Sequence, residues 1–214
     1  MKIVIVGAGI GGLSTYLALK KHLSTSLFSD SGFDSEKQKF NISIVESHAS
    51  PTSQRSYIGG DLNFAPNGLR AIASLSPTAV ERIQALSFPS SHMVLRNAQG
   101  KTLGTLRFGS QERYDYEMCM LPRAVLHEAL LAEMEDADIK WGMRLVGIKE
   151  LEQGGIVLEY ADGTMETADL VIGADGVHSF VKGHLLNGQY QSQYEYVTRF
   201  FSLSLDEKEL IGYL

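Results

Sequence analysis

The chain has 214 residues, of which 44% are hydrophobic, so it can bury the core of one good-sized domain or two small ones. Its formal net charge of -6 argues against a nucleic-acid surface, which needs clustered lysine and arginine. One cysteine, Cys119, excludes an internal disulfide framework and fits a reducing compartment. We interpret Cys119 as a small buried apolar residue.

Neither a membrane span nor a metal site is expected. Lys2 precedes an apolar stretch, as in a signal peptide, but glycines interrupt that stretch. No other stretch approaches the length of a membrane span. The histidines lack metal-ligand spacing, and the nearest pair, His178 and His184, has no cysteine or carboxylate arranged around it. These observations predict a cytoplasmic protein without a metal.

The first fifty residues predict a strand, a helix and a second strand. Residues 3–6 form a β-branched run bounded by glycine, and residues 10–22 have helical periodicity. Residues 24–39 are polar and serine-rich, which is typical of a surface insertion. Residues 41–45 predict a strand that ends at Glu46. This order indicates a βαβ unit with parallel strands and a right-handed crossover.

Further along the chain, helices alternate with hairpins. Proline stands near the start of each of the next predicted helices, where its missing N–H is harmless. These helices are expected over residues 66–75 and 77–86 and directly after Pro122. Hairpins are expected over residues 94–107 and 157–167, and a buried strand near residue 170 precedes a short helix from about His178. The pattern predicts a mixed α/β protein with inserted antiparallel strands.

The turn after the first strand, GAGIGG, satisfies the pattern GxGxxG and lies directly between a strand and a helix. Gly7 would make the tight turn, Gly9 would let the backbone approach a pyrophosphate, and Gly12 would let helix and strand pack closely. The pyrophosphate would then meet the helix N-terminus, where free N–H groups and the helix dipole favour an anion. The motif therefore predicts a dinucleotide site.

Glu46 strengthens this prediction, because an acidic residue at the end of the second strand can accept hydrogen bonds from a ribose diol. It follows the motif at more than the usual spacing, which the insertion at residues 24–39 explains. The alternative interpretation is a solvated carboxylate at a strand end. FAD and NAD share this fingerprint, so the motif does not choose between them.

Three further segments carry a resemblance to a known family. GADGVHSFVK at residues 173–182 resembles the Asp-Gly motif of the flavin-dependent aromatic hydroxylases, such as p-hydroxybenzoate and salicylate hydroxylases, and of related fungal FAD-dependent monooxygenases. IGGDLNFAPNGLRAI at residues 58–72 and LPRAVLHEAL at residues 121–130 are similar to two other segments of that family. The resemblance implies a Rossmann-like FAD-binding fold that is incomplete at its C-terminal end.

The resemblance also implies roles for particular residues. The FAD pyrophosphate would lie on Gly7, Ala8, Gly9, Gly11 and Gly12. Glu46 would hold the adenosine ribose, and Gly60 would let the backbone pass near the cofactor. Arg123 would make charge-assisted contacts to FAD. Asp175 and Gly176 would form a turn that the family associates with flavin and NAD(P)H. By the alternative interpretations, Arg123 is a helix-start arginine and the Asp-Gly pair is an ordinary strand-end turn.

The chain departs from the family in several places. A bulky residue, Tyr16, occupies a position where the family favours a small one, and Lys182 closes the Asp-Gly motif where the family has arginine. The second FAD motif and the full substrate-binding sheet of the family are not found in these 214 residues. We therefore expect an FAD-binding domain over residues 1–185, with an inserted hairpin region at about residues 88–120. The start of a truncated substrate domain would then occupy residues 186–214.

The function implied by the resemblance is that of an NAD(P)H-dependent flavin monooxygenase. It would hydroxylate or epoxidise a small organic substrate through a flavin hydroperoxide. Arg199 and Tyr196 are candidates for catalytic residues, against the plainer interpretation of a surface arginine and an edge-strand tyrosine. Two alternatives stay open: a non-catalytic nucleotide-binding remnant or interaction module, and an NAD-dependent dehydrogenase. A truncated chain would expose apolar surface, which predicts a homo-oligomer.

Overall fold

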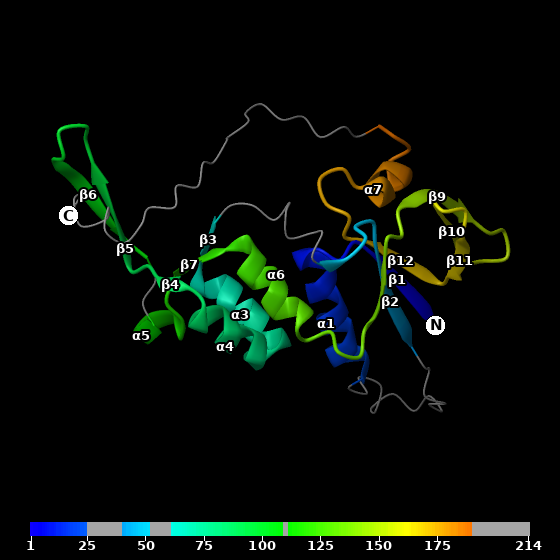
Figure 1. The fold of residues 1–214 in the computed structure, drawn as a ribbon, viewed down its shortest axis with the longest axis horizontal. Coiled ribbons are helices and arrows are strands. Elements are labelled where there is room, and N and C mark those ends of the chain that lie inside the picture. Colours follow the sequence, from blue (N-terminus) through cyan, green and yellow to red (C-terminus); the bar gives the residue numbers. More distant parts are fainter. Residues whose placement is uncertain (25–39, 52–60, 109–110, 190–214) are drawn as a thin grey trace.

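The computed structural model describes residues 1–24, 40–51, 61–108 and 111–189 and shows a mixed α/β fold (Figure 1). Its centre is a four-stranded sheet in the order β12–β1–β2–β8, and all of its neighbouring strands are parallel. The strands are β1 (Lys2–Val6), β2 (Asn41–Glu46), β8 (Asp138–Trp141) and β12 (Leu170–Gly173). The predicted parallel β1–β2 pair is confirmed.

Strand β1 is apolar and buried from Ile3 to Val6, because both faces of the parallel sheet are covered there. On one face, Ile5 packs in a cluster with Leu13 of helix α1 (Ile10–Ser24). On the other face, Val4 packs in a second cluster with Leu158. Leu158 belongs to a three-stranded antiparallel sheet of β9 (Leu145–Glu150), β10 (Ile156–Tyr160) and β11 (Met165–Ala168). The parallel sheet is thus held between a helix and a small sheet (Figure 1).

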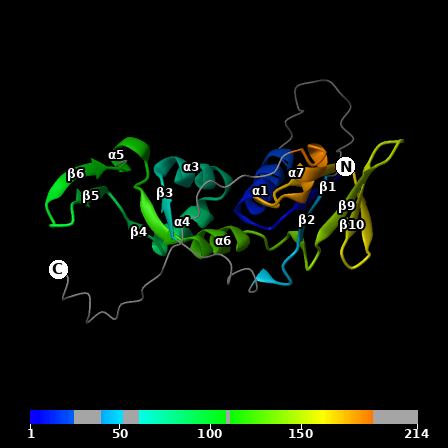
Figure 2. The same cartoon turned by 90° about the horizontal axis from the view of Figure 1, so that it is seen from above.

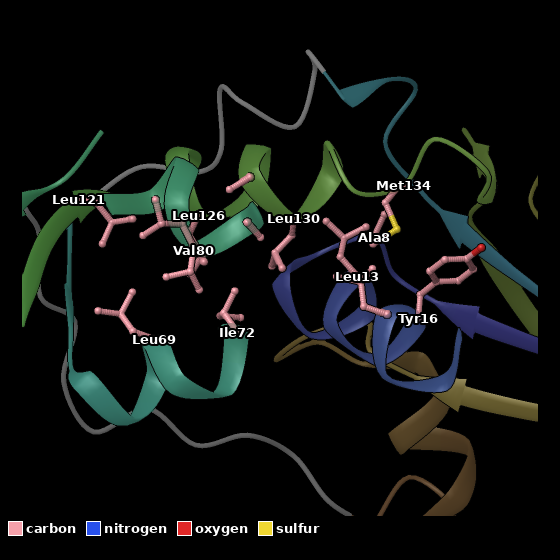
Figure 3. Close-up of a cluster of buried hydrophobic side chains, with 14 of the residues drawn as sticks. Ala8, Leu13, Tyr16, Leu69, Ile72, Val80, Leu121, Leu126, Leu130 and Met134 are labelled. Carbon is pink, nitrogen blue, oxygen red and sulfur yellow. The ribbon is translucent and has the colours of Figure 1, made fainter. Parts of the chain in front are cut away.

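A second group of elements adjoins α1. Strands β3 (Asp61–Phe64), β7 (Cys119–Pro122) and β4 (Phe88–Pro89) form an antiparallel sheet. Helices α3 (Pro66–Leu75), α4 (Pro77–Ala85) and α6 (Arg123–Leu131) lie beside it. Figure 3 shows that one apolar cluster continues from these helices, through Leu130 of α6, to Leu13 of α1. Helix α6 therefore connects the core of this group to the helix that covers the parallel sheet. Cys119 is buried in the same cluster, as the sequence predicted.

Strands β5 (His92–Arg96) and β6 (Thr102–Arg107) form a hairpin that projects at the end of the molecule far from the parallel sheet (Figures 1 and 2). Every residue of β5 and all but one of β6 are exposed. The exposed side chains include Leu103 and Leu106, at 68% and 52%. A two-stranded hairpin without a packed face contributes little stability by itself.

Most of the predicted elements are confirmed, including both hairpins and the helices that begin at Pro66 and Pro77. The short last helix, α7 (Phe180–Leu185), begins two residues after the predicted start because Ser179 caps it, accepting a hydrogen bond from the Lys182 N–H. The sequence did not predict β3, β4, β7, β8, β9 or the one-turn helix α5 (Gln111–Tyr114). Within the described ranges, the helices are all too short or too polar to cross a bilayer. The same ranges contain no metal-binding group of three or more His, Cys, Asp or Glu side chains.

Candidate cofactor site

A cavity of about 670 Å³ lies at the carboxyl ends of β1, β2 and β12. This edge of an open α/β sheet is where such folds bind their ligands. The cavity is lined by the glycine-rich turn, by the residues that end β2, by the start of α6 and by residues 173–176. Segments that are far apart in the sequence therefore meet at one site.

The backbone of the glycine-rich turn leaves no room for side chains at two of its glycines. Gly7 has φ 106°, and an added Cβ there would lie 2.5 Å from the Ala174 carbonyl oxygen. A Cβ at Gly12 would lie 1.8 Å from the Gly7 carbonyl oxygen, so α1 starts in direct contact with the turn. A Cβ at Gly9 would meet no atom of the described residues within 4 Å, and Gly9 lines the cavity. The turn is therefore tightly packed on the side that faces the protein interior, at Gly7 and Gly12, and open on the side that faces the cavity, at Gly9.

Two side chains from other elements hold the peptide groups of Ala8. The Ala8 N–H donates to Glu46 Oε2 at 2.7 Å. The Ala8 carbonyl lies 2.8 Å from Nε2 of His127 on α6. A carbonyl can only accept, so this His127 nitrogen carries the proton. Ala8 is fully buried, and the two bonds satisfy both of its polar backbone groups.

Glu46 is 5% exposed and ends β2 at the cavity wall. Burial by itself raises the pKa of its carboxyl group, but hydrogen bonds from the N–H groups of His48 and Ala8 and from the His48 ring outweigh burial and lower the pKa. Oε1 accepts from the His48 N–H at 2.9 Å, from His48 Nδ1 at 2.6 Å and from Ser47 Oγ at 3.1 Å. Oε1 is saturated with donors, whereas Oε2 accepts only from Ala8 among the described residues and can take one more.

Asp175 follows β12 and anchors the start of α7. Its Oδ1 accepts from Ser179 Oγ at 2.5 Å, and its Oδ2 accepts from the N–H groups of Phe180 and Val181 at 2.6 and 3.2 Å. A carboxylate in this position satisfies N–H groups that a helix start leaves free. Asp175 thereby fixes the loop through Gly176, and both residues line the cavity.

The structure brings most of the predicted cofactor residues together. Those that line the cavity are Gly7, Gly9, Gly11, Glu46, Arg123, Asp175 and Gly176. Ala8 and Gly12 lie behind them and are buried in the turn. Gly60, Tyr196 and Arg199 lie outside the described residues. That these residues bind a cofactor, or act in catalysis, stays a prediction.

Arg144 and His127 are among the residues of this site that sequence reasoning missed. Arg144, just before β9, lines the cavity and is its second arginine in addition to Arg123. No motif marks Arg144, because it reaches the cavity from the connection that leads into the small antiparallel sheet. His127 lies four positions after Arg123, hence on the same side of α6, and is 3% exposed. A buried polar residue in the apolar pattern of α6 was the only signal for it in the sequence.

The chain was compared with protein-family models, and none matches. Individual proteins do match. A 3-amino-4-hydroxybenzoate 2-monooxygenase from Streptomyces cremeus is 27% identical over 190 residues, which is 85% of this chain and 41% of that protein. An FAD-dependent urate hydroxylase from Klebsiella pneumoniae is 26% identical over 91% of this chain and 45% of its own length. Salicylate hydroxylase from Pseudomonas putida is 27% identical over 88% of this chain and 39% of its own length.

Solved structures show the same fold. Klebsiella pneumoniae HpxO, in a crystal structure with FAD and uric acid, superposes with a TM-score of 0.67 at 24% identity, covering 86% of this chain and 41% of that one. The 2,6-dihydroxypyridine-3-hydroxylase from Arthrobacter nicotinovorans gives a TM-score of 0.66 at 20% identity over 91% of this chain. The chain thus spans less than half the length of the relatives that it matches. In sequence and in fold, the chain is therefore similar to FAD-dependent monooxygenases.

Proposed function

We propose that this chain binds FAD in the cavity at the ends of β1, β2 and β12. In the whole protein it would serve as the cofactor-binding part of an NAD(P)H-dependent monooxygenase. The observation that carries the proposal is that one cavity is lined by the glycine-rich turn, Glu46, Arg123 and Asp175. The glycine-rich motif, the acidic end of the second strand and the family resemblance single out the same four features in the sequence. Their convergence is what a single dinucleotide would require.

The chemistry of the cavity wall fits FAD. A volume of about 670 Å³ lies within the range of small-molecule and cofactor sites. The start of α1 faces it with a glycine-rich turn, which suits a pyrophosphate. Arg123 and Arg144 add positive charge, and arginine suits the oxygens of phosphate groups. The wall therefore combines anion-binding groups with a carboxylate, as a dinucleotide with a free ribose diol demands.

Each residue would have a distinct task. Gly9, with open space in front of it, would let the pyrophosphate approach the backbone. Glu46 would accept a ribose hydroxyl at Oε2, where one acceptor site remains beside Ala8. Arg123 would hold a phosphate or ribose oxygen, and Asp175 would keep the loop through Gly176 in place beside the cofactor. Arg199 and Tyr196 are retained as proposed catalytic residues of the whole protein.

FAD, when bound, supplies the redox and oxygen chemistry by which NAD(P)H and oxygen are consumed and a substrate is hydroxylated or epoxidised. The named relatives act on aminohydroxybenzoate, urate and salicylate. We therefore propose a small aromatic or heteroaromatic molecule as the substrate of the whole protein. The substrate would be held largely by residues beyond those of this cavity.

The test is a titration of the purified chain with FAD, followed by flavin fluorescence and by the visible absorption spectrum. The proposal expects saturable quenching and the spectrum of bound oxidised flavin. A parallel titration with NADH distinguishes the alternatives. NADH binding without FAD binding would instead favour a dehydrogenase. FAD binding by the chain, without consumption of NAD(P)H by the whole protein in the presence of any of the relatives' substrates, would favour the non-catalytic binding module.

We also propose that the chain self-associates through the exposed hairpin. Apolar side chains are exposed on both strands, and residues 91–108 contain Arg96, Lys101 and Arg107 but no acidic residue. Two such hairpins repel each other, whereas the remaining chain carries an excess of negative charge. The hairpin of one copy would therefore meet an acidic surface of another. Sedimentation should show oligomers that dissociate in Leu103→Gln, which removes apolar surface without changing the charge, and that weaken with salt, and a monomer at every concentration would refute the proposal.

A further inference from the structure

Buried His127 contacts the glycine-rich turn and has no part in the function proposed above. Its Nε2 lies 2.8 Å from the Ala8 carbonyl oxygen, and the two residues are 119 positions apart in the sequence. Both are inside the protein, with His127 3% exposed and Ala8 fully buried. A buried hydrogen bond between distant segments fixes their relative position, because breaking it leaves a polar group without a partner.

The bond restrains more than one atom of the turn. The carbonyl of Ala8 and the N–H of Gly9 belong to one planar peptide group and point in opposite directions. Within the described residues, the Gly9 N–H donates to no acceptor, and Gly9 lines the cavity. Holding the carbonyl from behind therefore sets the direction of an N–H that is free to meet a ligand.

The bond also sets the position of Arg123. Arg123 and His127 occupy the same side of α6, one turn apart, and Arg123 lines the cavity. Figure 3 shows Ala8 in the apolar cluster that joins α6 to α1. That cluster holds the helices together, but apolar contacts do not fix a helix along its axis as a hydrogen bond does. His127 supplies that directional contact between α6 and the turn.

We propose that His127 is a positioning residue for the cofactor site. Its Nε2–H fixes the Ala8 carbonyl, so that the Gly9 N–H and the Arg123 guanidinium are set for the same dinucleotide. Glu46 completes the arrangement from the other side, by accepting from the Ala8 N–H at 2.7 Å. This inference rests on the proposed function for the identity of the ligand but not for the geometry of the turn.

The experiment compares the wild-type chain with three variants. His127→Leu removes the donor, His127→Gln keeps an N–H at about the same distance from the backbone, and Leu126→Ala loosens α6 at the neighbouring buried position. The first readout is hydrogen exchange in the chain without ligand. The amides of Gly7 and Ala8 report on the turn, since they donate to the Val45 carbonyl and to Glu46.

In His127→Leu, we expect these two amides to exchange about tenfold faster, the factor that corresponds to one hydrogen bond. His127→Gln should restore slow exchange of the Gly7 and Ala8 amides. In Leu126→Ala, these two amides should not be accelerated more than the other amides of the chain. Unchanged exchange in His127→Leu would overturn the inference, whatever ligand the wild-type chain binds. An equal acceleration in Leu126→Ala would also overturn it, because the effect would then come from α6 as a whole.

The second readout is the dissociation constant for FAD. We expect about a tenfold weaker affinity in His127→Leu, with recovery in His127→Gln. If the wild-type chain binds FAD and His127→Leu binds it equally well, the inference fails and the proposed function stands. If the wild-type chain does not bind FAD, the proposed function fails, and hydrogen exchange decides on His127 alone.

Discussion

The carboxylate of Glu46 accepts a hydrogen bond from the Ala8 N–H at 2.7 Å, so the end of β2 holds the turn that follows β1. The ring and backbone N–H groups of His48 hold the other oxygen of the same carboxylate. Glu46 therefore shapes the turn and lines the cavity at once. This double role gives the first prediction.

Replacing Glu46 with glutamine should weaken FAD binding by about tenfold. The amide keeps the size of the side chain but loses the charge that strengthens the bonds from Ala8 and His48. Fluorescence titration measures the affinity. Glu81→Gln is the matched control, because Glu81 is exposed on α4 and does not line the cavity. Equal affinities in the wild type and in Glu46→Gln would show that the carboxylate does not contribute to binding.

Replacing Gly12 with alanine should destabilise the fold by roughly 3 kcal/mol or more. The new Cβ would lie 1.8 Å from the Gly7 carbonyl oxygen, and a backbone atom cannot yield as a flexible side chain does. Urea unfolding measures the loss. Gly183→Ala is the comparison, since a Cβ there meets no atom of the described ranges within 4 Å and the position is also helical. Similar stability in the two variants would contradict the close contact between α1 and the turn.

Arg123 should contribute charge and geometry separately. Arg123→Met should weaken FAD binding by about ten- to a hundredfold, and Arg123→Lys should recover only part of the loss, because lysine keeps the charge without the planar fork. Arg70→Met serves as control, since Arg70 is exposed on α3 and away from the cavity. Full recovery by lysine would mean that charge alone matters at this position.

A second carboxylate, Glu166, gives a prediction about acid stability. Burial opposes its ionisation, but hydrogen bonds from Tyr160, Lys2 and Lys140 outweigh burial and lower its pKa to about 2. Tyr160 donates at 2.5 Å, and the two lysine Nζ atoms lie 2.9 and 3.0 Å away. Because the folded pKa is depressed, this stabilisation is present above pH 4.5, the ordinary value, and is lost as the pH falls toward 2.

Glu166→Gln should therefore be less stable than the wild type at pH 7 by roughly 2 kcal/mol, and the difference should shrink between pH 4.5 and pH 2. Urea unfolding at several pH values measures it. Glu152→Gln, an exposed change in the loop before β10, should show no such difference. A gap between Glu166→Gln and the wild type that is constant over this range would rule out ionisation of Glu166 as its cause.

The sequence predicted the parallel β1–α1–β2 unit well because its signals are local. An apolar run marks a strand that is buried on both sides, and the glycines mark the turn. Strand β8 was missed for the opposite reason. It has only four residues, and its place in the sheet depends on pairing with β2, at Ser43 opposite Asp138. No local pattern records a partner so distant in the chain.

The candidate site was predicted in part for the same reason. Gly9 and Glu46 follow from a motif with a known mechanism, and Arg123 and Asp175 follow from the resemblance to a family. The sequence suggested a Glu46 carboxylate available to a ribose, whereas the structure shows that one of its oxygens is already saturated. His127 could not be assigned from the sequence, because its partner is a backbone carbonyl, and every residue carries one of those.

The most direct test of the cofactor site is a side-by-side FAD titration of the wild-type chain and Gly9→Ala, with urea unfolding of both. A methyl group at Gly9 meets no atom within 4 Å in the part of the chain that the structure describes, so the unfolding free energy should change by less than about 1 kcal/mol. The same methyl would stand where the pyrophosphate approaches the backbone, so saturable FAD binding should be present in the wild type and lost in the variant. Equal FAD affinity in both proteins would contradict the placement of the cofactor on this turn.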